Sequence, residues 1–171
     1  MSRIVRRTRP VVAEVQETCI LGIDPGNSGA LAVLTEDGDY VDSMIIPIVA
    51  SGKSNRVNGA AVAAFLAQYN IVHAYIEKVG AMPGNGGTSM FTFGHSAGKV
   101  EGIVEGRMIP VTHLTPQSWK KAGNLVNKPK DCARSRCVQL YPHVRILDTK
   151  IRGGAVGDAI LIARAGHGLS M

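Results

Sequence analysis

The sequence predicts a mixed-sheet α/β domain in which antiparallel strands come first. An apolar run over residues 19–34 is interrupted only by the turn-forming segment 24–29, which is typical of two strands joined by a tight turn. A second turn, the acidic segment 36–39, precedes a third predicted strand, Tyr40–Val49. Helical and strand patterns then alternate to the end of the chain. Three antiparallel strands followed by such alternation indicate a mixed sheet flanked by helices.

The later elements are predicted from apolar periodicity, from capping residues and from the glycine-rich loop over residues 80–87. Asn58 is the expected cap of the first helix, and Thr88 or Ser89 is the expected cap of the second. The predicted order is helix 58–68, strand 71–79, helix from 88 or 89 to about 106, strand 109–114, a short helix opening at 115–116, helix 128–140 and helix 155–165.

Length and composition fit one compact domain. The chain has 171 residues, of which 45% are hydrophobic, and we expect a basic N-terminal arm over residues 1–17 followed by a single domain over 18–171. No apolar stretch approaches the ~20 residues that span a bilayer, so no membrane partner is expected. The three cysteines lack zinc or redox spacing, which favours a reducing compartment. We therefore expect a cytoplasmic protein of a bacterium or of a phage-infected cell, with an organelle as the alternative.

Charge is distributed unevenly along the chain. Residues 10–106 carry ten acids against four Lys and Arg, a net charge of −6. Residues 107–171 carry eleven Lys and Arg against three acids, a net charge of +8. A basic half beside an acidic cluster fits a polyanion that is held electrostatically while metal ions neutralise the catalytic carboxylates. A merely soluble basic protein is the alternative on charge alone.

Three acidic residues each interrupt or end an apolar segment. They are Asp24 in Ile23-Asp24-Pro25-Gly26, Glu77 in Tyr75-Ile76-Glu77, and Asp158, which we expect in the first turn of the last helix. An unpaired charge is costly to desolvate in such places, whereas carboxylates in a partly dry cleft bind Mg²⁺. Asp24 and Asp158 also have ordinary explanations as a turn residue and a helix-start residue, whereas a salt bridge with Lys78 explains Glu77 poorly because adjacent strand residues face opposite sides. Together they predict a metal-dependent nuclease, because two such ions can drive attack on a phosphodiester.

Two further segments have residues suited to binding nucleic acid. Lysines and arginines follow Thr115-Pro116 and are suited to backbone phosphates, although a solvated helix face is the alternative. The glycine-rich loop after the Glu77 strand overhangs the predicted site, and Met90 or Phe91 can wedge against an unstacked base. Packing within the helix is the alternative role for Phe91 or Phe93.

In order and spacing these segments resemble the RuvC family of Holliday-junction resolvases, in its phage, bacterial and plastid branch, over residues 21–169. The resemblance is carried by Gly22-Ile23-Asp24-Pro25-Gly26, Tyr75-Ile76-Glu77-Lys78, Met90-Phe91-Thr92-Phe93-Gly94, Thr115-Pro116-Gln117-Ser118-Trp119-Lys120, Lys130-Asp131, Tyr141-Pro142 and Gly157-Asp158-Ala159-Ile160.

The resemblance implies a ribonuclease-H-like fold, a homodimer, and paired nicks that resolve a branched, four-way DNA junction. Asp24, Glu77 and Asp158 would be ligands of two Mg²⁺ ions per site, with Mn²⁺ as a substitute. Lys120 would lie near the scissile phosphate and complete the catalytic set. The implied DNA contacts are Gly84, Asn85, Ser89, Met90, Phe91, Lys121, Lys128, Lys130 and Arg134.

The chain departs from the family pattern at one position. The family supplies a fourth ligand, Asp or His, three or four residues before the last acid, where this chain has Ala155 and Gly154. A junction-binding protein that cuts weakly or not at all is therefore an alternative. An ATPase with a similar phosphate loop is disfavoured because 171 residues leave no space for two domains. A nuclease for RNA–DNA hybrids is disfavoured by segment 115–120.

Overall fold

The computed structural model describes residues 17–52, 54–80, 84 and 86–171, so most of the predicted N-terminal arm and the predicted contact Asn85 lie outside the described residues. Its centre is a five-stranded mixed sheet in the order β3-β2-β1-β6-β7. β1 pairs antiparallel with β2, and β2 with β3, whereas β6 runs parallel to both β1 and β7. The strands are β1 Thr18–Asp24, β2 Ala30–Thr35, β3 Tyr40–Ile45, β6 Asn70–Glu77 and β7 Val111–Leu114.

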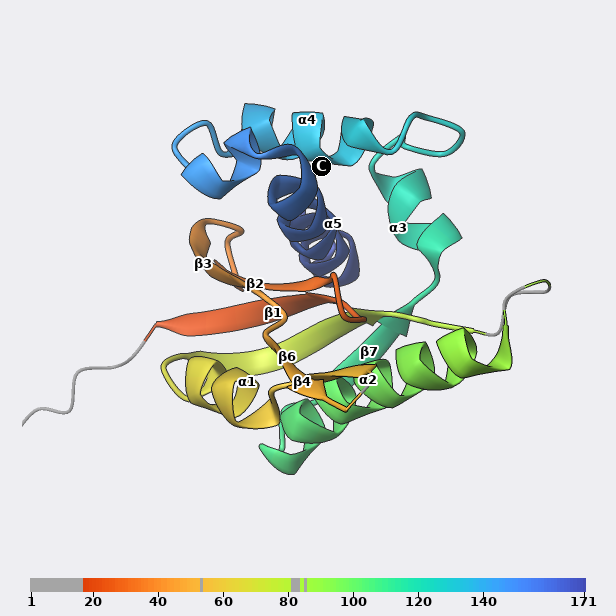
Figure 1. Ribbon diagram of the computed structural model, residues 1–171. Coiled ribbons are helices and arrows are strands. Elements are labelled where there is room, and N and C mark those ends of the chain that lie inside the picture. The colour runs from red at the N-terminus through yellow and green to blue at the C-terminus, as the bar shows by residue number, and fades with distance from the viewer. Residues whose placement is uncertain (1–16, 53, 81–83, 85) are drawn as a thin grey trace, which may run out of the picture.

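Helices cover both faces of this sheet (Figure 1). α5 crosses one face, with α3 and α4 beyond it, and α1 and α2 cover the other. The cores on the two faces are separate clusters, one centred on α5 and one on α1 and α2. The helices are α1 Gly59–Leu66, α2 Gly87–Gly106, α3 Pro116–Ala122, α4 Asp131–Leu140 and α5 Lys150–His167, with a 3₁₀ turn η1 at Arg145–Asp148.

The central strands form because their side chains are apolar on both faces. All six residues of β2 are buried, as are the five inner residues of β1. Burial on both faces is what a helix-covered strand requires, and it explains the near-continuous apolar run in the sequence. The predicted mixed α/β sheet flanked by helices is confirmed.

The predicted third strand was wrong in its second half. β3 ends at Ile45, and the chain then forms a separate hairpin, β4 Ile48–Ser51 with β5 Ser54–Val57. Pro47 interrupts the apolar run, and its carbonyl accepts the backbone N–H of Asn58 at 2.7 Å. Proline lacks the N–H that a continued ladder needs, which explains the break.

The position of α5 over the sheet is set by close contacts between backbone segments. A Cβ atom on Gly22 of β1 would stand 1.9 Å from the carbonyl oxygen of Ala159, and one on Gly153 would stand 2.7 Å from that of Ile146. Gly157 faces the Cα of Arg134 in α4 in the same way, at 3.2 Å. Glycine at these points lets α5 pack directly on β1, η1 and α4, because a Cβ would clash with backbone at Gly22 and Gly153 and would be tightly packed at Gly157.

Those glycines also explain why the predicted start of the last helix was wrong. Gly153 and Gly154 suggested a loop before Ala155, but α5 begins at Lys150, and the Thr149 hydroxyl caps it by accepting the N–H of Gly153 at 3.1 Å. Asp158 therefore lies in the third turn of α5, outside the first turn where we expected the helix dipole to favour its charge. Among the described residues, no helix has the length and apolarity to cross a membrane.

The other helix starts agree more closely with the sequence. Asn58 caps α1 by accepting the N–H of Ala61 at 3.2 Å, and Thr115 caps α3 by accepting that of Ser118 at 3.1 Å. α2 begins slightly before the predicted caps, with Gly86 as its N-cap and no side-chain cap bond. α4 begins at Asp131, three residues after the predicted Lys128.

Candidate active site

Asp24, Glu77 and Asp158 all line one cavity of about 300 Å³. Asp24 ends β1 and Glu77 ends β6, and because these neighbouring strands are parallel, both carboxylates emerge at the same edge of the sheet. Asp158 reaches the cavity from α5, which the Gly22 contact holds tightly against β1. The turn that follows β1, residues 25–29, closes one side of the cavity. The structure therefore brings together the three acids that the sequence separates by 53 and 81 positions.

The carboxylates of Asp24 and Asp158 are held in a setting that disfavours their charge. Burial, followed by repulsion from Asp158 and Glu77, raises the pKa of Asp24 to about 7. Burial and repulsion from Glu77 raise the pKa of Asp158 to about 6. Lys130 and Lys120 act in the opposite direction on both acids without restoring their ordinary values. A cation placed among these carboxylates would relieve the repulsion.

Glu77 is oriented by a tryptophan. The indole Nε1–H of Trp119 donates to Oε2 of Glu77 at 2.6 Å, and Trp119 is itself 2% exposed. Trp119 stands in α3, whose start is fixed by the Thr115 cap and by Pro116 at its first position. A buried indole N–H needs an acceptor, and here that acceptor is a carboxylate at the cavity. One oxygen of Glu77 is thereby committed to Trp119.

The donor set fits a hard divalent cation, but it is not a tightly preassembled site. Carboxylate oxygens are the ligands Mg²⁺ prefers, and three of them face one cavity. Across the ranges described above, however, no three His, Cys, Asp or Glu residues are grouped closely enough to hold a metal ion as they stand. Ions of this kind also keep several waters, so an incomplete set of protein ligands is compatible with binding. Asp24, Glu77 and Asp158 are the residues that would hold the metal.

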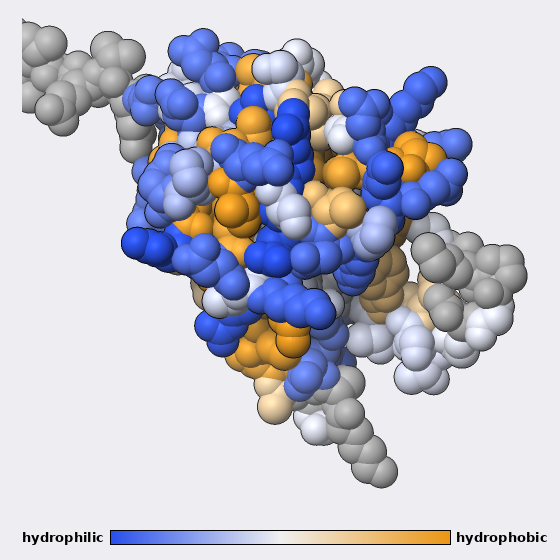
Figure 2. All heavy atoms as spheres, turned by 90° about the horizontal axis from the view of Figure 1, so that it is seen from above, coloured by the Kyte–Doolittle hydropathy of each residue, from blue (hydrophilic) through white to orange (hydrophobic). Residues whose placement is uncertain are grey.

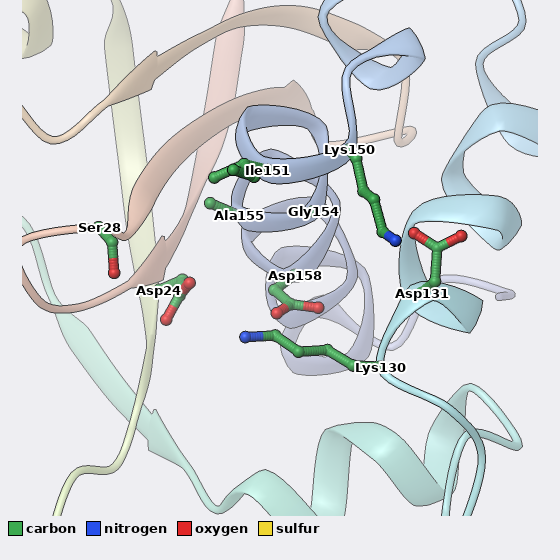
Figure 3. Close-up of a pocket in the computed structure, with 9 residues that line it drawn as sticks. All are labelled: Asp24, Ser28, Lys130, Asp131, Lys150, Ile151, Gly154, Ala155 and Asp158. Atoms are coloured by element: carbon green, nitrogen blue, oxygen red, sulfur yellow. The ribbon is translucent and has the colours of Figure 1, made fainter.

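The expected fourth ligand has no counterpart at its usual place. Gly154 and Ala155 lie one turn before Asp158 on the same face of α5, and both line a second cavity of about 320 Å³ next to the acids (Figure 3). Asp131 lines that cavity too, but Arg134 holds its carboxylate with bonds of 2.8 and 2.9 Å. Asp148 stands at the end of η1 and is exposed.

The predicted basic residues fall into two groups. Lys120 and Lys130 line the cavity of the three acids, and Lys128 lines an adjoining cavity with both of them. The amine of Lys120 lies 5.2 Å from the ring centre of Trp119, so the same tryptophan contacts Glu77 and the lysine. Lys121 is exposed on α3 outside these cavities.

The side chain of Arg134 is engaged in hydrogen bonds within the protein. Its guanidinium bonds to Asp131, and its Nη1 donates to the carbonyl of Leu147 at 3.0 Å, which ties α4 to η1. Its role in DNA contact stays a prediction.

The face of the molecule above α4 and α5 is largely hydrophilic, with separate apolar patches (Figure 2).

The predicted junction-facing segment surrounds the start of α2. Gly84 is exposed with a φ of 90°, Ser89 is exposed, and Met90 is half-buried. Phe91 is 74% exposed, which fits a wedge, and its ring stacks on that of His95 with centroids 6.2 Å apart. These contacts to DNA stay predictions.

Two residues outside the predicted site set connect α2 to the site: Phe93, for which the sequence suggested packing within the helix, and Ser96. Phe93 lines the cavity, and its ring edge would lie 2.9 Å from a Cβ on Gly26. The buried Ser96 donates from its hydroxyl to Oδ1 of Asn27 at 2.7 Å. Trp119 was a third omission from the predicted site, although a single tryptophan within a basic segment could have drawn attention to its N–H. Ser96 and Asn27 carried no comparable signal because both are common in turns and helices.

Comparison with known proteins supports the fold. No model of a protein family matches the sequence, and no curated protein sequence is detectably similar. Among solved structures, Thermus thermophilus RuvC in complex with a Holliday junction substrate matches with a TM-score of 0.59 and 16% identity, covering 87% of this chain and 92% of that chain. A second structure of RuvC from Thermus thermophilus matches with a TM-score of 0.55 and 17% identity, covering 86% and 92%.

The mixed five-stranded sheet and its flanking helices thus define a ribonuclease-H-like fold. The particular version of that fold is the one seen in RuvC. At this level of identity the likeness concerns the fold, so the phage, bacterial or plastid branch and the residue roles stay predictions.

Proposed function

We propose that this protein is a metal-dependent endonuclease that resolves four-way DNA junctions. The single observation that carries the proposal is the convergence of Asp24, Glu77 and Asp158 on one cavity together with Lys120 and Lys130. The RuvC-like fold and the structural match to RuvC bound to a Holliday junction substrate support it. Branched DNA is the proposed partner, and a homodimer is proposed because a four-way junction offers two equivalent cleavage positions.

Each residue has a chemical role in this proposal. Asp24, Glu77 and Asp158 would hold Mg²⁺, which when bound would polarise the scissile phosphate and lower the pKa of the attacking water. Trp119 keeps the Glu77 carboxylate oriented through its N–H. Lys120, held beside the Trp119 ring, offers a positive charge where negative charge develops on the phosphate. Two of these acids resist ionisation without a cation, which suits a site built to receive one.

The surroundings of the cavity suit a DNA backbone and unpaired bases. Lys120, Lys128 and Lys130 line adjoining cavities along one path, and residues 107–171 carry a net charge of +8. Such charges hold phosphates without reading sequence. Phe91, exposed at the start of α2, can stack on a base at the open centre of a junction.

A second candidate is a protein that grips branched DNA without cutting it. Two observations favour it: Gly154 and Ala155 offer no fourth ligand, and within the described residues the acids do not form a compact metal cluster. Against it stands the cost of keeping three acids in a half-buried cleft, where they also repel phosphates.

The deciding experiment is cleavage of a labelled synthetic four-way junction and of a matched linear duplex, each with Mg²⁺ and with EDTA. Symmetric, metal-dependent nicks confined to the junction support the nuclease. Tight junction binding with no cleavage in Mg²⁺ or Mn²⁺ supports the binding protein. Glu77→Gln should abolish cleavage and spare binding, and a variant that still nicks at the wild-type rate would show that the site is wrongly assigned.

A further inference from the structure

Lys130 holds a central position in the candidate site. It directly precedes α4, and together with Asp158 it lines all three cavities that meet at the acids. Its side chain extends toward the space between Asp24 and Asp158, whereas the amine of Lys150 is directed toward Asp131 (Figure 3). It lowers the cost of charge on both Asp24 and Asp158. A side chain so placed acts on the acids as well as on any bound DNA.

Few protein ligands are available beside Asp158 for a second divalent ion. Gly154 and Ala155 carry no side-chain donor atom, and Asp131 is bonded to Arg134. Among the described residues that line this cavity, the remaining side-chain oxygen outside the acids is the hydroxyl of Ser28, a weak ligand compared with a carboxylate. Trp119 donates to one oxygen of Glu77, which makes Glu77 the least suited of the three acids to bridge two ions.

Charge leads to the same conclusion. Three carboxylates share the cleft with the ammonium groups of Lys120 and Lys130. One divalent cation is enough to make this group of charges positive overall, and a second would have to approach it against repulsion from Lys130. In a partly desolvated cleft that repulsion is weakly screened.

We infer that this site takes one divalent cation and that the ammonium of Lys130 supplies the second positive charge beside Asp158. The inference rests on the proposed metal-dependent function and specifies how its site is completed. Lys130 in this role stabilises the carboxylates before DNA arrives and faces the phosphate when DNA is bound. It substitutes for the ion that a carboxylate at position 154 or 155 would otherwise help to hold.

The test is the number and affinity of bound ions in the intact chain without DNA, measured with Mn²⁺ by electron paramagnetic resonance and with Mg²⁺ by calorimetry. The wild-type chain should bind one ion. Lys130→Met, which keeps the aliphatic stem of an exposed residue, should bind that ion about tenfold more tightly because a nearby like charge is removed. Lys150→Met is the matched control, since its amine lines the same wall but faces Asp131, and it should leave the affinity unchanged.

A double variant tests directly how many ions the site binds. Lys130→Met with Ala155→Asp removes the ammonium and adds a carboxylate one turn before Asp158, so this variant should bind two ions. Two ions in the wild-type chain, or unchanged affinity in Lys130→Met, would overturn the inference and leave metal-dependent cleavage standing. No ion bound by any of the proteins, together with no cleavage, would overturn both the inference and the proposed function.

Discussion

Replacing Asp24 with asparagine should stabilise the metal-free protein at alkaline pH. The carboxyl group of Asp24 is half-buried and faces Asp158 and Glu77, and its pKa is raised from 3.8 to about 7. Asparagine has nearly the same shape but never ionises. The variant therefore removes a charge that the folded state disfavours, while leaving the packing of the turn at residues 25–29 almost unchanged.

The sign and size of this change in the free energy of unfolding follow from proton linkage. Between pH 4 and 7 the folded wild-type chain binds a proton at Asp24 that the unfolded chain has released, so its free energy of unfolding falls as pH rises and is fully reduced above pH 7. A difference of roughly three pH units corresponds to ~4 kcal/mol at most. Because solvent reaches part of this carboxyl group, we expect a measured gain for Asp24→Asn of about 1–3 kcal/mol at pH 8.

Urea unfolding in EDTA, at pH 4 and at pH 8, measures this effect. The fluorescence of Trp119 is a suitable signal because it is the single tryptophan and lies at the site. Asp37→Asn, at an exposed position of the β2–β3 turn, is the control and should change stability little at either pH. A stability advantage of Asp24→Asn that is absent at pH 8, or equal at both pH values, would refute the electrostatic reasoning.

Three further predictions concern side chains around the site. Trp119→Phe removes the N–H that orients Glu77, so we expect about tenfold slower cleavage and a higher Mg²⁺ concentration for half-maximal rate, with junction affinity unchanged. A loss seen only in thermal stability would make Trp119 a packing residue. Lys120→Ala should slow single-turnover cleavage by about 10²-fold or more and weaken binding little, whereas a pure loss of affinity would reduce Lys120 to a phosphate contact. Gly22→Ala forces a Cβ against the carbonyl of Ala159 and should lower the free energy of unfolding by about 3 kcal/mol. Gly102→Ala, in an open part of α2, is the control and should raise the free energy of unfolding by about 0.5–1 kcal/mol. Equal effects of the two changes would contradict the close packing of α5 on β1.

The sequence predicted the strands better than the last helix, for a physical reason. The runs that became β1 and β2 are apolar on both faces, and their separating turn contains Pro25 and Gly26, so pattern and turn chemistry agree. In α5, Gly153 and Gly154 act against helix propensity, yet packing on η1 keeps Gly153 within the helix. Tertiary contacts overrode local preference there, and local preference was all that the sequence offered.

The convergence of three acids could be anticipated from the sequence, but the side chains that contact them could not. Asp24, Glu77 and Asp158 stood out because charge inside an apolar segment is costly, and the structure does bring them to one cavity. The bond from Trp119 to Glu77 joins residues 42 positions apart and has no local signature. The position of Lys130 between two acids likewise depends on how α4 docks on α5, through Gly157 and Cys137, whose thiol donates to the carbonyl of Gly157 at 3.4 Å.

The same packing that positions Asp158 also makes the site electrostatically costly, and this cost argues for a metal. Gly22 lets α5 approach β1 so closely that Asp158 comes near Asp24, and the mutual repulsion raises the pKa of Asp24. A protein that only held DNA would gain nothing from this arrangement, because unneutralised carboxylates repel phosphates and reduce stability at neutral pH. A cation reverses both effects, since it stabilises the ionised acids and attracts the phosphate. The arrangement therefore favours the proposed metal-dependent hydrolysis over DNA binding alone.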